Sequence, residues 1–341
     1  MTDSKPNPKA GHPAPYFPPE WAAQNWLWIG FPHLAEEWPG FLDSAQEQIA
    51  DFASAVAQSG QDVRLLVRDD ANAARAAKLV SKDVTLVQAK YGDIWLRDTG
   101  PLIIKSDRQM PSQRAAQLFG FNGWGGKYQM DGDQTIGGDL AQAAQLPIAR
   151  SAMIFEGGAV DSDGTGLAVT TEQCLLNPNR NPAMTRADIE AELQRTLGFE
   201  RLLWLGEGLI NDHTDGHVDN LARFVGPNRI VIAEATGTDD PNAAVYEDAA
   251  ARASDFGLQV ERIPSPGRME RAGEIEPASY VNFAITTHLV VVPTFGSAHD
   301  AAGVAAIAEL FPDRETVGLR ADAVLAGGGG FHCASQQMPA I

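Results

Sequence analysis

The chain has 341 residues, 44% of them hydrophobic and 21% charged, which is typical of a globular protein with a sizeable core and excludes a mostly disordered chain. Lys and Arg number 26 and Asp and Glu 44, so the formal net charge is −18, which disfavours nucleic acid and anionic membranes as partners and favours cationic ligands. The sequence has two cysteines, no apolar signal segment and no run of 18 apolar residues, so we expect a soluble, cytoplasmic protein.

The distribution of proline and apolar residues indicates how the chain is organised. Residues 1–18 are rich in proline and poor in apolar side chains, so we expect a mobile tail there. The polar stretches 107–112 and 123–139 are too short, or too rich in aromatic residues, to be linkers between domains. Residues 19–341 are therefore expected to form a single domain.

Five helices are predicted from apolar spacing and from end signals. The clearest has Thr185 and Asp188 as a capping box, Ile189 and Leu193 on one face, and Gly198 after its last turn. The other four are predicted over residues 41–56, 71–80, 241–256 and 300–311.

Short strands are predicted between these helices, and their alternation favours an α/β fold. The predicted strands are residues 63–67, 84–87, 102–105, 116–121, 153–155, 167–170, 202–205, 217–225, 229–234, 258–263, 280–284, 288–293 and 324–326. A unit of strand, helix, strand and hairpin, used five times, would give a pseudo-symmetric ring.

Side chains able to do chemistry concentrate in five segments, each at an expected junction between a loop and a strand. The segments are WLRDTGP (95–101), FEGG (155–158), DHTDGHVDN (212–220), YVNF (280–283) and GGGGFHC (327–333). Each combines ionisable or polar side chains with residues that permit tight turns.

The most highly charged of these segments surrounds His217. On a strand, His217 and Asp219 would point to the same face, giving a proton carrier beside a carboxylate that could hold a cation. A polar surface strand is one alternative, and a metal site built from His213, His217 and Asp219 is another. The metal reading is disfavoured because Gly216 and two β-branched residues argue against the helix that would bring His213 and His217 together.

Cys333 follows four consecutive glycines, which can approach a ligand closely, and a cysteine in that position could act as a nucleophile. The alternative is a buried, inert thiol, the role expected of Cys174. A phosphate loop is rejected because no Lys, Ser or Thr follows the glycines at the required spacing.

Four further residues are weaker candidates, each with an ordinary structural alternative. Asp98 could be a salt-bridged turn residue, and Trp95 a core residue, but together they could hold a cation. Glu156 could be a turn residue. Asn282, expected on a strand between apolar neighbours, could donate hydrogen bonds into a cleft.

Several long motifs in fixed order resemble those of the agmatine deiminases, within the bacterial-type arginine deiminase family. They are WLRDTGP, FNGWGGKY (121–128), EGG, TTEQCLLNPNRNP (170–182), HTDGHVDN and GGGGFHCASQQ, and the resemblance runs from about Pro19 to the C-terminus. It implies a five-bladed pseudo-symmetric α/β propeller of ββαβ-type units, with one deiminase catalytic domain and its site in a central channel.

The resemblance also implies roles for individual residues. Cys333 would be the nucleophile, His217 the general acid and base, and Asp98 and Asp219 the groups that grip a planar guanidinium. Trp95 and Asn282 would line the site, and no metal or organic cofactor is implied. Because two carboxylates would stand beside the thiol, we expect the Cys333 pKa to be raised until a cationic substrate arrives.

The sequence departs from the family pattern at Ala159, Asp161 and Gly330, where serine, histidine and asparagine are usual, which leaves the shape of the substrate-tail pocket open. Agmatine carries a second cationic end that Asp215, Asp212 or Glu156 could neutralise, whereas arginine or a peptide would bring a carboxylate. The acidic residues favour agmatine.

The expected function is hydrolysis of agmatine to N-carbamoylputrescine and ammonia. The alternatives are a deiminase of arginine or peptidyl-arginine, a metal-dependent hydrolase, and a non-catalytic polyamine-binding protein. The expected partner is a small cationic guanidine, while homo-oligomer formation is left open by the sequence.

Overall fold

The structure is a computed structural model that describes residues 15–105 and 114–341. Residues 1–14 of the expected tail therefore lie outside the described part. The backbone N–H and C=O of Tyr16 each pair with Lys105 at 2.9 Å, and the Phe17 ring packs edge-on against Phe199. Packing thus begins a few residues before Pro19.

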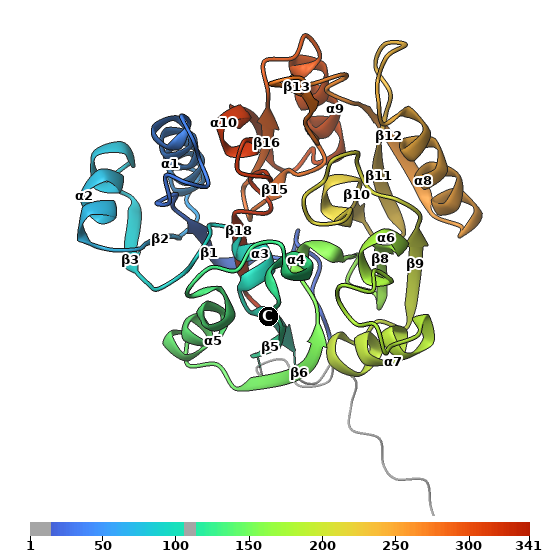
Figure 1. Cartoon of the computed structure of the whole chain (residues 1–341), viewed down its shortest axis with the longest axis horizontal. Helices are drawn as coiled ribbons and strands as arrows, with labels where there is room; N and C mark the ends of the chain where they lie inside the picture. Colours follow the sequence, from blue (N-terminus) through green and yellow to red (C-terminus); the bar gives the residue numbers. More distant parts are fainter. Residues whose placement is uncertain (1–14, 106–113) are drawn as a thin grey trace, which may run out of the picture.

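The fold is mixed α/β, and Figure 1 shows its small sheets gathered around a common centre. The first sheet holds β18 (Ser335–Pro339), β1 (Gln24–Gly30), β2 (Val63–Val67) and β3 (Val84–Gln88). The second holds β4 (Leu102–Lys105), β5 (Arg114–Gly120) and β6 (Ile148–Ile154), and the third β7 (Asp161–Ser162), β8 (Leu167–Thr171) and β9 (Arg201–Leu205). The fourth holds β10 (Ala222–Gly226), β11 (Arg229–Glu234) and β12 (Gln259–Pro264), and the fifth β15 (Ala284–Ile285), β16 (Leu289–Thr294) and β17 (Glu315–Arg320). A separate hairpin pairs β13 (Glu270–Arg271) with β14 (Glu274–Ile275).

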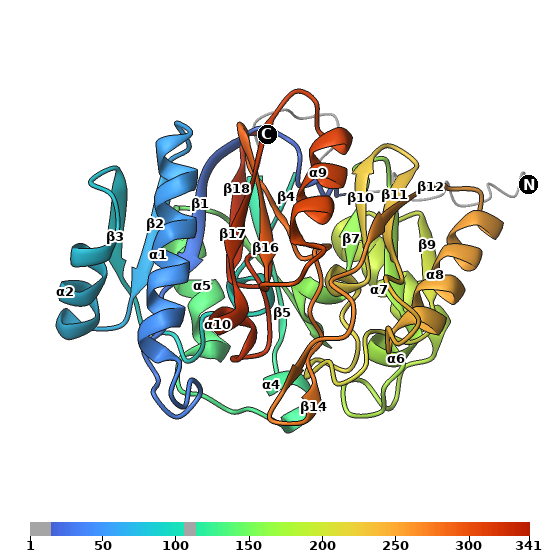
Figure 2. The same ribbon diagram turned by 90° about the horizontal axis from the view of Figure 1, so that it is seen from above.

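These five sheets share one pairing pattern. In each, an inner strand pairs antiparallel with one neighbour and parallel with the next, as β5 does with β4 and β6. The parallel step needs a crossover, which a helix supplies. These helices are α1 (Leu42–Gln58), α5 (Asp133–Ala143), α7 (Arg186–Leu197), α8 (Ala243–Asp255) and α9 (Asp300–Leu310). Figure 2 shows α8 at one end of the molecule, and α2 (Asp70–Leu79) at the other end beyond α1.

All five predicted helices are present, the fifth being α2 (Asp70–Leu79) beside α1, α7, α8 and α9. They are not distributed one per sheet, however, because α1 and α2 both belong to the first sheet. The second sheet uses α5, which was not predicted because Gly137 and Gly138 interrupt its apolar pattern. The capping box of α7 is confirmed, with Thr185 and Asp188 each bonded to the other's backbone.

One strand prediction is wrong, and two others are only partly right. Residues 217–225 begin with the 3₁₀ turn η2 (Val218–Asn220), and the strand starts only at Ala222. Of residues 280–284, only Ala284 is in a strand. Residues 324–326 lie in or just after the short helix α10 (Asp322–Leu325). Four further short helical turns are α3 (Leu96–Thr99), α4 (Gly123–Gly126), η1 (Gly157–Ala159) and α6 (Glu172–Leu175).

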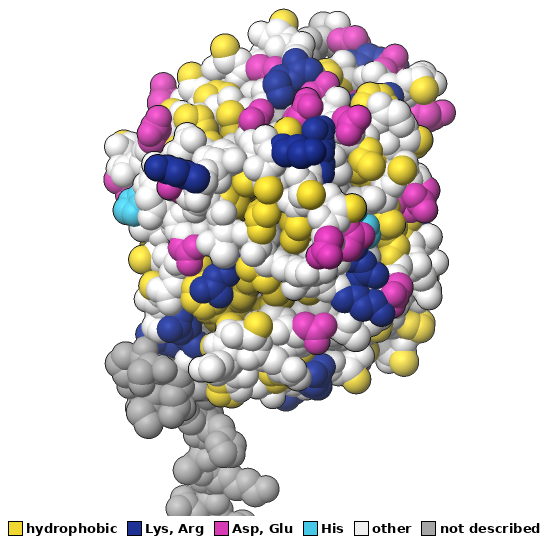
Figure 3. All heavy atoms as spheres, turned by 90° about the vertical axis from the view of Figure 1, so that its left-hand side faces the viewer, with side chains coloured by type: hydrophobic (Ala, Val, Ile, Leu, Met, Phe, Trp, Pro, Cys, Tyr) yellow, Lys and Arg dark blue, Asp and Glu magenta, His cyan; other side chains and the backbone are white. Residues whose placement is uncertain are grey.

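The apolar core lies between the sheets and the helices that cover them. The inward faces of α1 and the strands around it are fully buried, and the rings of Phe52 and Phe331 stack at 4.7 Å just behind the nucleophile candidate's turn. Figure 3 shows acidic and basic side chains interspersed on the face at the α2 end, so the negative charge is not concentrated there. Within the described residues, no helix combines the length and hydropathy needed to cross a bilayer.

Candidate active site

The candidate residues sit on turns that leave or enter different sheets and meet at the centre. Asp98 lies on α3, His217 caps η2, and Asp219 lies within η2. Asn282 precedes β15, and Cys333 stands two residues before β18. Turns rather than strands hold these side chains, so the strand argument that pairs His217 with Asp219 does not apply, although both residues do reach the site.

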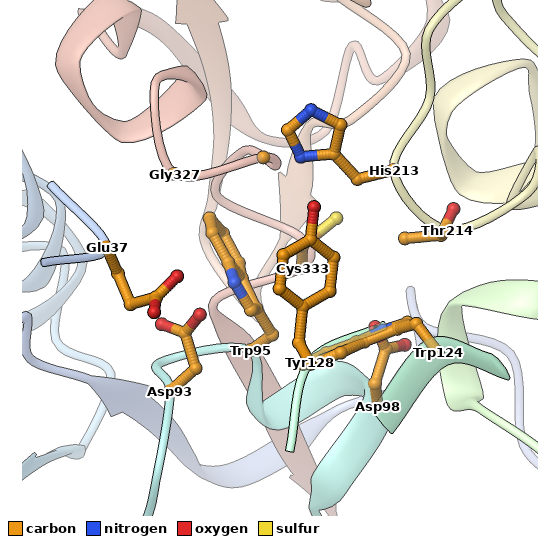
Figure 4. Close-up of a pocket in the computed structure, with 11 residues that line it drawn as sticks. Glu37, Asp93, Trp95, Asp98, Trp124, Tyr128, His213, Thr214, Gly327 and Cys333 are labelled. Atoms are coloured by element: carbon orange, nitrogen blue, oxygen red, sulfur yellow. The ribbon is translucent and has the colours of Figure 1, made fainter. Parts of the chain in front are cut away.

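A pocket of about 410 Å³, its open mouth included, leads to Cys333 (Figure 4). It is lined by Glu37, Asp93, Trp95, Asp98, Trp124, Tyr128, His213, Thr214, Gly327, Gly328 and Cys333. The carboxylate of Asp98 lies on the floor beneath the Trp124 indole, and the Cys333 sulfur lies behind the Tyr128 ring in this view. The pocket therefore contains a thiol, a carboxylate and aromatic faces.

Cys333 is only 5% exposed, but it forms part of the pocket wall. The Asn282 amide nitrogen lies 3.0 Å from its Sγ and Asp219 Oδ2 lies 3.4 Å from it. The pKa of the thiol is raised well above its ordinary value, first by burial and then by the charges of Asp219 and Asp98. The direction agrees with the sequence-based expectation, with burial as an additional and larger cause.

Asp219 is held by a chain of buried groups that extends to the N-terminal part of the molecule. His332 Nδ1 lies 2.7 Å from Asp219 Oδ2, and His332 Nε2 lies 2.9 Å from Glu20 Oε2. Glu20 in turn forms an ion pair with Arg223. Burial opposes ionisation of Asp219, but the contact with His332 and the charges of His217 and Arg223 together outweigh it and lower the Asp219 pKa, so this carboxylate stays charged.

Asp98 and His217 meet at Gly158. The Gly158 N–H and the Trp124 indole N–H donate to the two oxygens of Asp98 at 2.9 and 2.8 Å. A methyl group at Gly158 would lie 2.6 Å from His217 Nδ1, 2.9 Å from Asp98 Oδ1 and 3.1 Å from Asp219 Oδ2. Only glycine therefore leaves room for these three side chains to converge.

His217 is fully buried, and neither of its ring nitrogens has a hydrogen-bond partner in the described part of the chain. Its Nδ1 lies 3.7 Å from Asp98 and its Nε2 lies 3.6 Å from Glu156. Burial alone would lower the pKa of His217, but Asp98, Cys174 and Glu156 outweigh it and raise the pKa well above the ordinary value. The imidazole is thus poised to carry a proton.

Glu156 and Asp215, which were expected to bind the substrate, do not line the pocket, and neither do His217, Asp219 and Asn282. Glu156 and Asp215 differ from those three residues in that both are paired with Arg180. Glu156 is fully buried and accepts from Arg180 Nε at 3.0 Å. Asp215 is paired with both Arg180 and Lys127. Because their charges are already matched, these carboxylates position His217 and the loop around it.

The geometry does not support a metal site built from His213, His217 and Asp219. Among the described residues, the His, Cys and carboxylate groups close enough to share an ion are Glu156, Cys174 and His217, within 4.8 Å of one another. His213 and Asp219 do not join that group, and a cation there would also meet Arg180, which already binds Glu156.

Residues 16–339 match the sequence model of the Porphyromonas-type peptidyl-arginine deiminases. The chain belongs to this family. A relative from Vibrio parahaemolyticus, which carries the provisional name agmatine deiminase, is 32% identical over 353 residues, covering 95% of this chain and 97% of the relative.

Solved structures of the family share the fold. The agmatine deiminase of Enterococcus faecalis superposes with a TM-score of 0.89 at 27% identity, covering 95% of this chain and 96% of that one. A C. jejuni agmatine deiminase with substrate bound has a TM-score of 0.87 at 25% identity, covering 95% and 96%.

The three departures from the family pattern lie outside the pocket wall. Asp161 pairs with Arg223 and accepts the Phe224 N–H at 2.6 Å, and Ala159 is buried. A Cβ at Gly330 would lie 2.6 Å from Asn282 Oδ1, so glycine there permits the Asn282 side chain that contacts Cys333. These positions shape the support of the site.

Several residues of the site were not predicted from the sequence. Glu20 directly follows the expected tail, and no periodicity marks it as buried. Arg180 lies in a polar loop where a surface charge is the ordinary expectation. Trp124 could have been suspected, because a tryptophan between glycines in FNGWGGKY has little reason to be exposed. Its φ of 51° turns the indole toward Asp98.

Proposed function

We propose that this chain is an agmatine deiminase, which hydrolyses agmatine to N-carbamoylputrescine and ammonia. The observation that carries the proposal is the convergence of a thiol, an imidazole and two carboxylates beside one pocket, with the thiol and one of the carboxylates in its wall. Cys333 and Asp98 come from turns far apart in sequence, His217 and Asp219 share a third turn, and all four residues are buried. Such a set suits a planar cation, because two carboxylates can grip guanidinium N–H groups while the thiol faces its central carbon.

In the first half of the reaction, Asp98 and Asp219 hold the guanidinium. The Cys333 thiol loses its proton to solvent as this cation binds, and the resulting thiolate attacks the guanidinium carbon. A C–S bond forms, and the C–N bond to the terminal NH₂ breaks. His217 gives its proton to the departing nitrogen, which leaves as ammonia. Asn282 directs its amide at the sulfur and steadies its position. The product of this half is a covalent thiouronium.

In the second half, neutral His217 takes a proton from water, and the water oxygen bonds to the thiouronium carbon. The C–S bond then breaks, returning the thiolate and releasing the substituted urea. The neighbours that raise the His217 pKa suit it to both steps, since it must alternate between its charged and neutral forms. Trp95 supplies an aromatic wall for the cation.

The proposal also covers the arrangement of the five sheets and the extent of the domain. The recurring sheet pattern supports a five-bladed pseudo-symmetric propeller with one catalytic domain over residues 19–341 around the central site. Cys174 and Cys333 are both free, which supports a reducing compartment such as the cytoplasm.

Ammonia release from agmatine, arginine and a peptidyl-arginine, measured side by side, tests the proposed function. Agmatine should be preferred, Cys333→Ser should abolish turnover, and a chelator should have no effect. A metal-dependent hydrolase would give the opposite responses to these two treatments. Binding without ammonia release would identify a polyamine-binding protein instead.

A further inference from the structure

A chain of side-chain hydrogen bonds leads from a half-buried carboxylate to the Cys333 sulfur, and the proposed chemistry gives no role to its outer members. Asp212 Oδ2 accepts from Asn220 Nδ2 at 3.1 Å, and Asn220 Oδ1 accepts from Asn282 Nδ2 at 2.9 Å. The same Asn282 nitrogen donates to Cys333 Sγ at 3.0 Å. Asn220 and Asn282 are only 4% and 2% exposed, so the two amides are held away from water.

The carboxylate at the outer end determines the direction of every bond in this chain. A carboxylate can only accept, so Asn220 must turn its NH₂ group toward Asp212 and its oxygen toward Asn282. Asn282 must then turn its own NH₂ group toward Asn220, which leaves the second hydrogen of that group for the sulfur. A donor, rather than an acceptor, is thus presented to Cys333.

The oxygen of the Asn282 amide is fixed separately, by the turn that carries the thiol. It accepts the backbone N–H groups of His332 and Cys333 at 3.1 and 3.3 Å. Glycine at position 330 leaves room for this arrangement, because a Cβ there would lie 2.6 Å from Asn282 Oδ1. Since both ends of the amide are held, the N–H group stays aimed at the sulfur and needs no reorganisation during the reaction.

The Asn282 amide acts on the thiol against burial and against two carboxylates. Burial and the charges of Asp219 and Asp98 raise the Cys333 pKa, whereas the Asn282 contact lowers it. The N–H group also binds a charged sulfur more strongly than a neutral one, while the 3.4 Å approach of Asp219 Oδ2 becomes repulsive once the proton has left. Asn282 therefore stabilises the thiolate more than the thiol.

Asp212 supports the imidazole of the site as well, through its other oxygen. Asp212 Oδ1 accepts from the Thr214 N–H at 2.9 Å and from the Thr214 hydroxyl at 2.6 Å. The Thr214 hydroxyl oxygen in turn accepts the His217 backbone N–H at 3.0 Å. Both oxygens of Asp212 are thus used within the fold, and one carboxylate supports both the nucleophile and the proton carrier that we propose.

We propose that this chain of three side chains presents an N–H group to the Cys333 sulfur and stabilises its thiolate. The inference rests on the proposed role of Cys333 as nucleophile. Asn282 touches the reacting sulfur and acts on it directly. Asn220 and Asp212 are positioning residues, because they act on the sulfur through Asn282.

Alkylation of Cys333 by neutral iodoacetamide, followed by mass spectrometry as a function of pH, tests this chain without any turnover, because only the thiolate reacts. Asn282→Ala removes the donor, and the midpoint of the alkylation profile should rise by about 1–2 pH units. The smaller thiolate fraction should lower kcat by about 10–100-fold. Asn220→Ala keeps the donor but releases it, so the midpoint should rise by about 0.5–1 pH unit.

The double variant distinguishes a chain from two separate contacts. If Asn220 acts through Asn282, combining the two alanine substitutions should shift the midpoint no further than Asn282→Ala alone. Asn72→Ala is the matched control, because Asn72 is also buried and uses both ends of its amide, with Pro32 O and Arg68 N each at 3.0 Å, but lies in α2. Its alkylation midpoint should stay unchanged.

An unchanged midpoint in Asn220→Ala or in Asp212→Ala would overturn the chain, and so would additive shifts in the double variant. If Asn282→Ala does not fold, Asn220→Ala decides, because it leaves the contacts of the Asn282 oxygen in place. Asp212→Ala should lower kcat further than Asn220→Ala does, since it also releases Thr214. Midpoint shifts as expected, with no ammonia release from agmatine by the unaltered chain, would overturn the proposed function and leave the chain.

Discussion

Asp219 Oδ2 lies 2.7 Å from His332 Nδ1 and 3.4 Å from Cys333 Sγ, so neighbouring residues on one turn contact the same carboxylate oxygen. The contact with His332 lowers the pKa of Asp219. It also fixes the direction of the carboxylate, because His332 is itself anchored on Glu20. His332 is thus a positioning residue for a group that we propose to hold the substrate.

Replacing His332 should therefore impair catalysis. The loss should be larger for a side chain that contacts neither Asp219 nor Glu20 than for one that still contacts Asp219. His332→Asn can still donate to Asp219 but cannot reach Glu20, and we expect kcat to fall about 10-fold. His332→Ala can bond neither Asp219 nor Glu20, and kcat should fall about 100-fold. Steady-state ammonia release measures both, with circular dichroism to verify folding. Equal activities of the two variants would show that the Asp219 contact does not position the carboxylate.

Gly158→Ala tests the close approach of His217, Asp98 and Asp219. Because the added methyl would lie within 3.1 Å of all three, we expect kcat to fall by at least about 100-fold while the chain still folds. Gly138→Ala in α5 is the control, since its methyl would meet only ordinary contacts at 3.6 and 3.8 Å. The Gly138→Ala variant should keep full activity. An unchanged kcat in Gly158→Ala would argue against the site geometry.

The thiol should titrate differently with and without a bound cation. Burial, Asp219 and Asp98 raise the Cys333 pKa, so the unliganded thiol is neutral near pH 7 and becomes a thiolate only at higher pH. An unreactive guanidinium ligand should lower the midpoint of the ultraviolet thiolate absorbance by about 1–3 pH units. Asp219→Asn should lower the midpoint without ligand while reducing turnover. Identical midpoints with and without ligand would refute substrate-coupled activation.

Arg180 and Lys127 both bind Asp215, but their contributions to stability should differ widely. Arg180→Ala leaves buried Glu156 without its cation, and the free energy of unfolding should fall by about 3–5 kcal/mol. The Lys127 contact is half-exposed, so Lys127→Ala should cost at most about 1 kcal/mol. Urea denaturation of both variants measures the difference. Similar losses would mean that the Glu156 contact is not stabilising.

Asp93→Asn should stabilise the protein at high pH. The Asp93 pKa is raised to about 7 in the fold, so the folded state binds this proton more tightly than the unfolded state. The protonated Asp93 carboxyl therefore adds to the stability of the fold. This contribution is complete below the pKa that Asp93 has in the unfolded chain, and it is lost as the pH rises through about 7. We expect the variant to gain about 3–4 kcal/mol relative to the unaltered chain between pH 4 and pH 8, measured by denaturation at both values. A pH-independent difference would contradict this.

The sequence predicts five of the longer helices because each has an apolar stripe, and it misses α5, where two glycines interrupt the stripe. It predicts strands where they are apolar. It fails at the centre, where turns are stabilised by contacts with distant residues. Ser335–Pro339 reads as a polar loop, yet β18 is fully buried. Gln337 Oε1 accepts from Arg97 Nη1 at 2.8 Å, and Gln336 Nε2 donates to the Pro101 carbonyl at 2.9 Å, and no local pattern reveals these partners.

The candidate site also has residues that could be predicted from the sequence and residues that could not. The residues proposed for catalysis lie in motifs dense in charge and glycine, so Cys333, His217, Asp98 and Asp219 could be selected from sequence. The sequence could not show whether a given carboxylate faces the pocket or is paired with an arginine. Asp215 and Glu37 are both loop acids, and only the fold determines that the first meets Lys127 while the second meets no described cation.

The pairing of β18 with β1 has a consequence for synthesis on the ribosome. The turn bearing Cys333 is followed directly by β18, which pairs antiparallel with a strand that begins at Gln24. During translation, the strands of the other four sheets emerge before the final strand can join the first. A nascent chain can therefore assemble its acidic groups well before it acquires the cysteine that we propose as nucleophile, and we expect it to be inactive until the two ends of the fold meet.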